Sequence, residues 1–176
     1  MFRPDTTWKQ GDDAVYFPDF IGSASACPVL FARISKAGRS IDSKFAGRYY
    51  DAIGYGMLLY PDDLMADGPE GFACACCMDH TSFLSYPLLD KATLDNPEHG
   101  LRIERDGEEI FRSPAGKAEY IAESIETASR FCYLRTGDFL VMELSQRMPL
   151  ASRSDAERQI CGYFGDNMVF DFKVVF

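Results

Sequence analysis

Short segments rich in apolar and β-favouring residues recur along most of the chain, and a single long stretch has helical spacing instead. The strand-like segments cover residues 27–35, 51–60, 139–144, 159–164 and 168–176, and residues 14–20 read as a strand that runs into a turn. Between residues 101 and 113, the sequence LRIER-DG-EEIFR predicts a β-hairpin, because Asp-Gly supplies the two positive φ values of a type I′ turn. The pattern predicts an α+β fold that is mostly β, with mixed sheets and one long helix.

The long helix is expected over residues 117–131, KAEYIAESIETASRF, where the apolar residues fall on one face and Pro114 precedes the first turn. A short helix is expected over residues 41–50. The segment 51–60, DAIGYGMLLY, reads as a buried strand whose glycines allow another backbone to approach closely, and Pro61 ends it.

Composition and charge narrow the range of partners. The 176 residues, 47% of them hydrophobic, are enough to bury a core, and we expect a single domain over residues 1–176. The net charge is −9 and no basic cluster stands out, so we expect neither a nucleic acid nor a membrane surface as partner. No segment resembles a signal peptide or a membrane span, which predicts a cytoplasmic protein whose six cysteines remain thiols.

The segment 71–80, GFACACCMDH, places three cysteines within four residues, followed by an aspartate and a histidine. Cysteine, aspartate and histidine are metal ligands, and closely spaced thiols also support redox chemistry. A third interpretation treats the cysteines as small hydrophobic residues of a strand or loop. The segment alone therefore allows a metal site, a redox site or a piece of core.

Several segments occur in the order and at nearly the spacing found in the fumarylacetoacetate hydrolase (FAH) family, which the chain resembles over almost its whole length. They are FRPDT (2–6), YFPDF (16–20), ARISKAGRSI (32–41), KFAGRYYDAIGYGM (44–57), the LRIERDGE hairpin, the helix after it and LRTGDFL (134–140). The similarity is to short bacterial members described as 2-hydroxyhepta-diene-dioate isomerases or acylpyruvate hydrolases. It implies an FAH-like fold of mixed sheets rolled around a central pocket, a homodimer, and a hydrolase, decarboxylase or isomerase acting on a small keto or diketo acid.

The resemblance also implies where a metal site would lie. Such proteins hold Mg²⁺ or Mn²⁺ with a Glu-x-Glu pair and an aspartate, and these three positions fall on Cys27, Val29 and Leu58. No glutamate or aspartate occurs between Ile21 and Lys36, so a small shift of the alignment does not restore the pair. We therefore expect no metal ligand of the family type and no cofactor.

Other family positions differ as well. The lysine that neutralises a developing oxyanion in the family corresponds to Cys76, and the glycine after it corresponds to Cys77. The family's amino-terminal strand, with the histidine and glutamate dyad that depends on it, has no counterpart before Arg3. Arg3 takes the place of a family lysine and is expected either to contact an anionic ligand or to form a structural ion pair.

A rebuilt site is the alternative. Zinc or copper would suit thiolate and imidazole ligands, and the candidates are Cys27, Cys76, Cys77, Asp79 and His80. Their spacing is not that of a zinc finger, and the competing interpretation is that the cysteines fill a strand or loop as small hydrophobic residues. Cys76 is also the candidate for a nucleophilic thiol.

Three further residues remain as weaker candidates. Asp62 and Asp63 could provide paired carboxylates for acid–base chemistry, although adjacent carboxylates after a proline are typical of a solvated turn. His80 is a candidate for a catalytic role on chemical grounds alone. His99, at the entry to the hairpin, is interpreted as a surface residue.

Two functions therefore stay open. The first is a non-catalytic homologue that has kept the scaffold for a binding or interaction role and that takes a small-molecule ligand or a protein partner. The second is an active hydrolase, decarboxylase or isomerase that uses a relocated metal site or none, and it rests on analogy of fold.

Overall fold

The computed structural model describes residues 1–9, 14–95, 100–114 and 117–176. Its strands are β1 Trp8–Lys9, β2 Val15–Tyr16, β3 Ser23–Ile34, β4 Tyr50–Pro61, β5 Ser82–Leu84, β6 Leu89–Asp90, β7 Leu101–Arg105, β8 Glu108–Arg112, β9 Phe139–Glu143, β10 Met148–Ser152, β11 Glu157–Phe164 and β12 Asn167–Val175. Its α-helices are α1 Asp62–Met65, α2 Gly68–Cys77 and α3 Ala118–Phe131. Short 3₁₀ helices are η1 Asp5–Thr7, η2 Ser43–Arg48, η3 Lys91–Asp95 and η4 Arg153–Asp155.

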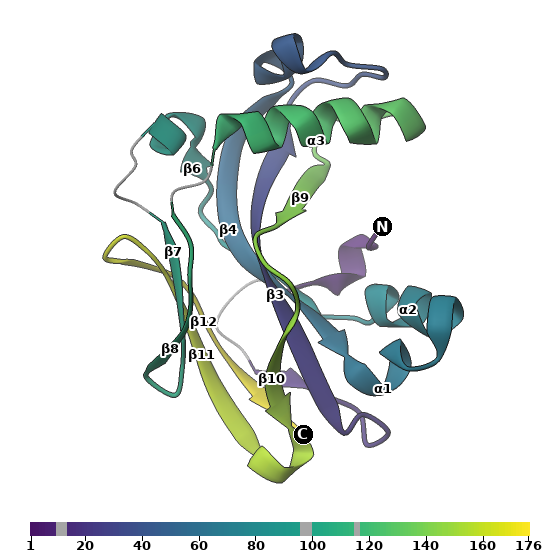
Figure 1. Ribbon diagram of the computed structural model, residues 1–176, viewed down its shortest axis with the longest axis vertical. Coiled ribbons are helices and arrows are strands. Elements are labelled where there is room, and N and C mark those ends of the chain that lie inside the picture. The colour runs from purple at the N-terminus through teal and green to yellow at the C-terminus, as the bar shows by residue number, and fades with distance from the viewer. Residues whose placement is uncertain (10–13, 96–99, 115–116) are drawn as a thin grey trace.

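The described strands form two mixed sheets. In the larger one, seven strands follow the path β1-β5-β4-β3-β10, with β6 added to β4 and β9 added to β3. In the smaller one, five strands follow the order β2-β12-β11-β7-β8. The β1–β5 and β2–β12 pairs are parallel, whereas the long β3–β4 pair is antiparallel. Figure 1 shows the smaller sheet beside the curved β3–β4 ribbon and α3 across one end. The predicted mostly-β fold with mixed sheets is confirmed.

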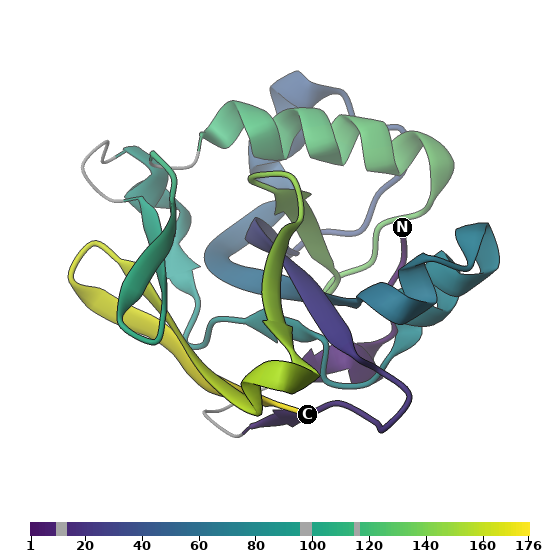
Figure 2. The same ribbon diagram turned by 60° about the horizontal axis from the view of Figure 1, so that its bottom comes forward.

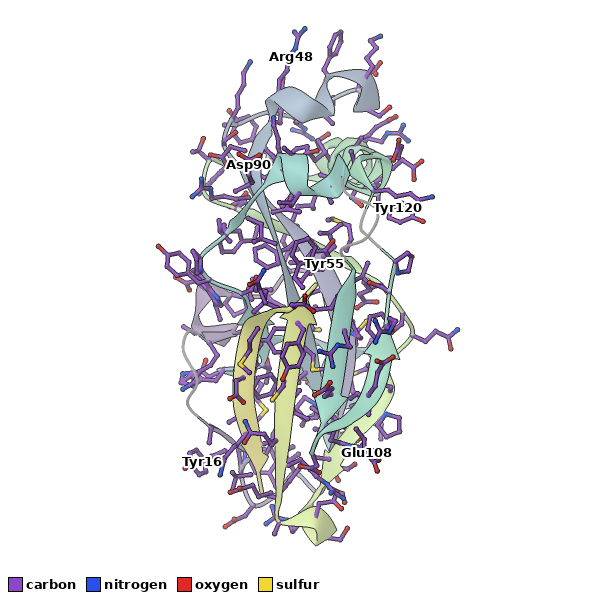
Figure 3. All side chains as sticks on the ribbon, turned by 90° about the vertical axis from the view of Figure 1, so that its left-hand side faces the viewer. Tyr16, Arg48, Tyr55, Asp90, Glu108 and Tyr120 are labelled. Carbon is purple, nitrogen blue, oxygen red and sulfur yellow. The ribbon has the colours of Figure 1, made fainter. Side chains whose placement is uncertain are left out.

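Aromatic stacking joins the two sheets across the main core. Phe83 of β5 stacks on Phe172 of β12 with ring centroids 3.6 Å apart, and Tyr55 of β4 stacks on Phe164 of β11 at 5.1 Å. In Figure 3, Tyr55 lies in the interior, whereas Glu108 and Asp90 lie at the periphery. We call this region the inner core; it includes Leu30, Ile34, Ile53, Met57, Leu59, Ile103, Ile160 and Val174.

The side chains of β3 and β4 are buried on both faces of the strand pair. Leu30, Ala32 and Ile34 of β3 turn toward the inner core, while Val29 and Phe31 turn toward a second cluster. This alternation follows the period of two of a β-strand, and burial on both faces explains the long apolar run in the sequence. At Gly56 an added Cβ would collide with the carbonyl oxygen of Phe83, which confirms the predicted close approach of another backbone.

The predicted hairpin and long helix are both confirmed. Asp106 has φ 53° and Gly107 has φ 83° between β7 and β8, as a type I′ turn requires. The helix α3 buries Ile121 and Ile125. On the same helix the Ser129 hydroxyl accepts a hydrogen bond of 2.8 Å from the Ile41 N–H, which fixes the helix against the η2 region.

The segment 14–20 is a short strand, β2, followed by a turn at residues 19–20, as expected. Other expectations need correction. The helix expected over residues 41–50 is the shorter 3₁₀ helix η2. The cysteine-rich segment, expected in a strand or loop, is the helix α2, and β10 was not predicted. No helix within the described ranges is long and apolar enough to span a membrane.

Candidate functional site

The face of β3 and β4 that turns away from the inner core carries a second apolar cluster. Its buried members are Cys27, Val29, Phe31, Leu58, Tyr60, Cys76 and Leu84, and we call it the outer cluster. None of these side chains is more than 8% exposed. In Figure 2, α1 and α2 lie on the side of β3 opposite the smaller sheet, where they help to cover this cluster.

The structure brings together all three positions at which the resemblance places metal ligands. Cys27 and Leu58 are direct partners in the β3–β4 register, and Val29 lies two residues along β3 on the same face. Their exposed fractions are 0% for Cys27 and Val29 and 4% for Leu58. These side chains offer one thiol and no oxygen ligand, whereas Mg²⁺ requires near-octahedral oxygen ligands. The residues present do not fit the metal that the resemblance implies.

Cys76, to which the resemblance assigns the position of the family's lysine, reaches the same cluster from α2. It is 2% exposed, while Cys74 and Cys77 on the same helix are exposed. The close packing of α2 against α1 depends on Gly71, where an added Cβ would collide with the Leu64 carbonyl oxygen. The buried face of α2 therefore contributes the Cys76 thiol to the outer cluster.

The two thiols of the outer cluster are poorly suited to nucleophilic chemistry. Burial, with a further contribution from the charge of Glu143, raises the pKa of Cys27 to about 11. The Cys27 thiol donates to the Ser145 carbonyl oxygen at 3.0 Å. Hydrogen bonding with Ser145 lowers the pKa of Cys27, but burial outweighs it. Burial also raises the pKa of Cys76, whose sulfur lies 3.3 Å from the Met1 thioether. Because the thiolate is the nucleophile, the raised pKa of Cys76 disfavours its candidate role.

A polar edge borders the outer cluster around Tyr60. The Tyr60 hydroxyl donates to Glu143 Oε1 at 2.8 Å. Arg3 Cζ lies 4.6 Å from the centroid of the Tyr60 ring, and Arg147 Cζ lies 5.2 Å from it, so two guanidinium groups interact with one aromatic ring. Burial and the hydrogen bond to Glu143 raise the pKa of Tyr60, while Arg3 acts in the opposite direction.

The Arg3 guanidinium joins β4 to β5 through uncharged acceptors. It donates to the Leu59 carbonyl oxygen at 3.0 Å, to Thr81 Oγ1 at 3.0 Å and to Ser82 Oγ at 3.4 Å. Among the described residues these acceptors take the place of the expected carboxylate of an ion pair. Arg3 therefore has a structural role at the margin of the cluster, where it links β4 to β5 and also contacts the Tyr60 ring.

The rebuilt metal site has no complete ligand set. The described part of the chain contains no group of three or more His, Cys, Asp or Glu side chains placed to hold an ion. Cys27 and Cys76 share the outer cluster, but Cys77, Asp79 and His80 are exposed. The structure thus does not assemble the five candidate ligands of the zinc or copper alternative.

Asp62 and Asp63 make local hydrogen bonds at the start of α1, where Asp62 is half-buried and Asp63 is exposed. Asp62 accepts from Ser23 Oγ at 2.9 Å and from Ser25 Oγ at 2.6 Å. Asp63 accepts from the Gly22 N–H at 2.8 Å, and this bond holds the pKa of Asp63 below its usual value. Both carboxylates tie α1 to the beginning of β3, which gives them a structural use.

His80 lies apart from the outer cluster. It lines a surface hollow of about 710 Å³ together with Lys9, Tyr16, Phe20 and Asp79. His99, expected at the surface, lies outside the described residues. His80 is therefore not placed beside Cys27 or Cys76 as a catalytic base.

Sequence reasoning missed Tyr60, Glu143 and Arg147. Tyr60 could have been found from periodicity, because it lies two residues after Leu58 and therefore on the same face of β4. Glu143 and Arg147 come from a distant part of the chain, and only the antiparallel pairing of β9 with β3 brings them to this edge.

Comparison with known proteins identifies the fold. No protein-family model and no curated protein matches the sequence. A protein assigned to the FAH family from Yersinia pestis CO92 superposes with a TM-score of 0.79, at 18% identity over 98% of this chain and 83% of its own. Fumarylpyruvate hydrolase from Pseudomonas aeruginosa, solved with Mn²⁺ and pyruvate, gives 0.77 at 20% identity over 98% and 76%.

A third structure agrees with these two. The 2-hydroxyhepta-2,4-diene-1,7-dioate isomerase from Mycobacterium marinum gives a TM-score of 0.80 at 15% identity over 98% of this chain and 67% of its own. At such low identities the likeness establishes architecture and leaves chemistry to the side chains. The resemblance seen in the sequence motifs is confirmed at this level, and the chain has the fold of the fumarylacetoacetate hydrolase family.

Proposed function

We propose that this protein is a non-catalytic homologue of the FAH-type hydrolases and isomerases, retained for a binding or interaction role. The observation that carries the proposal is the outer cluster, in which Cys27, Val29 and Leu58 occupy the positions that the resemblance assigns to metal ligands. The Pseudomonas aeruginosa neighbour was solved with Mn²⁺ and pyruvate. In this chain the region where the resemblance would place such a metal is packed with apolar side chains.

The loss of all three ligands differs in kind from a weakened site. Removing one outer partner of a metal ligand typically costs about 10- to 100-fold in affinity or activity. When the ligands themselves are replaced, a hard cation would lose coordinated water and gain no oxygen ligand from these three positions. We therefore expect no Mg²⁺- or Mn²⁺-dependent hydrolysis or isomerisation.

The polar edge supports a role in binding. The Tyr60 side chain is buried, with the guanidinium groups of Arg3 and Arg147 near its ring and its hydroxyl bonded to Glu143. The side chains of Glu143 and Arg147 are exposed at this edge. A small ligand or a protein segment with both polar and aromatic groups could use these contacts without any bond being broken. An active enzyme with a relocated metal remains the competing function, and the experiment below distinguishes the two.

Calorimetric titration with Mg²⁺, Mn²⁺ and Zn²⁺, each with and without oxalate or pyruvate, tests the proposal. We expect no binding heat from any of the three metals. Tight Mg²⁺ or Mn²⁺ binding that oxalate strengthens would overturn the loss of the family site. Zinc binding that requires Cys27 or Cys76 would instead favour the relocated metal site.

A matched variant makes a negative result informative. Cys27→Glu, Val29→Glu and Leu58→Asp together restore the ligand types that the resemblance implies, and this variant should gain Mn²⁺ binding that the natural chain lacks. Three buried carboxylates repel one another when no metal is bound, so the unfolding temperature of this variant should rise when Mn²⁺ is added. No rise in a variant whose circular dichroism shows it to be folded would contradict the placement of the site.

We further propose a homodimer located in the cytoplasm. Exposed aromatic side chains, among them Phe2, Phe131 and Tyr133, support an association surface. All six cysteines lie in the described residues and are free, which supports a reducing compartment. Light scattering should give twice the chain mass of 19.8 kDa, and a monomer at micromolar concentration would contradict the dimer.

A further inference from the structure

The helix α2 carries a pair of exposed thiols that the proposed function does not use. Cys74 and Cys77 are both exposed, and they occupy positions i and i+3 of one helix. Residues three apart lie on the same face of an α-helix, so the two side chains are neighbours on the surface. Cys76, between them in sequence, points the other way into the outer cluster.

We propose that Cys74 and Cys77 form a modification site, a dithiol that exchanges with small disulfides and closes into a disulfide within α2. In a helix the Cβ atoms of such a pair lie about 5–6 Å apart. A disulfide requires about 3.5–4.5 Å between Cβ atoms and about 4.4–6.8 Å between Cα atoms. The Cα spacing of a helical turn already meets the second condition, so closure needs a local movement of about 1–2 Å.

The end of α2 can provide this movement. Cys77 is the last helical residue, and Met78 after it is extended, with φ −67° and ψ 130°. A change in the backbone of Cys77 therefore shifts one terminal residue and leaves the preceding turns hydrogen-bonded. The same pair in the middle of a helix would have to distort the turns on both sides.

The exchange is balanced in atoms and electrons. The thiolate of one cysteine attacks a sulfur of a low-molecular-weight disulfide, forms a mixed disulfide and releases one small thiol. The second cysteine then attacks the protein sulfur of that mixed disulfide and releases the other small thiol. Two protein thiols are oxidised, one small disulfide is reduced, and the two protons pass to the released thiols.

Cys76 is the internal control for this chemistry. It is adjacent in sequence to Cys77, but it is 2% exposed and its sulfur lies 3.3 Å from the Met1 thioether. Neighbouring residues of a helix face different directions, so Cys76 cannot approach either exposed thiol without unwinding the turn. Access and direction therefore select Cys74 and Cys77 from the three cysteines of α2.

The reduced full chain, treated with oxidised glutathione and then alkylated, gives the test by peptide mass mapping. We expect an internal disulfide between Cys74 and Cys77, with the mixed glutathione disulfide at less than about a tenth of the oxidised protein, because the second thiol is present at a high effective concentration. In Cys74→Ser or Cys77→Ser, the mixed disulfide on the remaining thiol should become the main product.

Cys132→Ser is the matched control, because it removes a thiol at the end of α3 and should leave the products unchanged. The proposal is overturned if the natural chain accumulates stable mixed disulfides on both residues. It is also overturned if the internal disulfide includes Cys76. Circular dichroism of the oxidised protein checks that the products come from the folded chain.

Discussion

The two faces of the β3–β4 pair are built from the same strands and meet different surroundings. The inner face packs against the smaller sheet, whose aromatic rings stack across the interface. The outer face is covered by α2, by partly buried residues such as Trp8 and Met65, and by β9 residues such as Phe139. One face is enclosed by two extended sheets and the other by short, separate elements. We therefore expect the inner core to carry most of the stability and the outer cluster to tolerate change.

The largest loss of stability is expected at Leu59 of β4, and the adjacent Leu58 provides the matched comparison. Leu59 is 0% exposed in the inner core, and Leu59→Ala should lower the free energy of unfolding by about 4 kcal/mol, near the upper end for such a change. Two sheets that are stacked on each other cannot collapse into the cavity. Urea unfolding at neutral pH measures the loss.

Leu58→Ala removes the same atoms from the opposite face and should cost less, about 2–3 kcal/mol. Leu58 is 4% exposed, and its neighbours on α2 and in the amino-terminal segment belong to short elements that can move inward to fill the space. Equal losses at Leu58 and Leu59 would show that the cover of the outer cluster is as rigid as the smaller sheet.

The smallest effect is a pH dependence confined to the outer cluster. Burial raises the pKa of Cys27 from 9.0 to about 11, so folding holds a proton that the unfolded chain releases. The stability that comes from this thiol is fully present below about pH 9 and is lost as the pH rises to about 11, an effect on the order of 2 kcal/mol. Chemical unfolding at a series of pH values measures it.

Cys27→Ala should remove this part of the alkaline slope, while Cys132→Ala at the end of α3 should keep it. Burial also raises the pKa values of Cys76 and Cys161, and both thiols are kept in the two variants. The difference between the slopes of the natural chain and Cys27→Ala therefore reports on Cys27. An unchanged slope in Cys27→Ala would show that folding does not raise the pKa of the Cys27 thiol.

Local sequence signals predicted the elements that depend on short-range chemistry. Asp106 and Gly107 determined the hairpin turn, and the spacing of Ile121 and Ile125 determined the long helix. The helix α2 escaped prediction, because its glycine and cysteine residues have weak helix propensities and its apolar residues show no clear helical period. Its formation depends on packing against α1 at Gly71.

For the candidate site, the sequence by itself determined what cannot be there: no carboxylate occurs between Ile21 and Lys36. The identity of residues in a strand limits the available ligands whatever the fold. Only the tertiary structure decided that Cys27, Leu58 and Cys76 share one buried cluster and that Tyr60 meets Glu143 at its edge. These contacts join residues far apart in the chain, and strand register and helix docking, which are set by the packing of the whole core, bring them together.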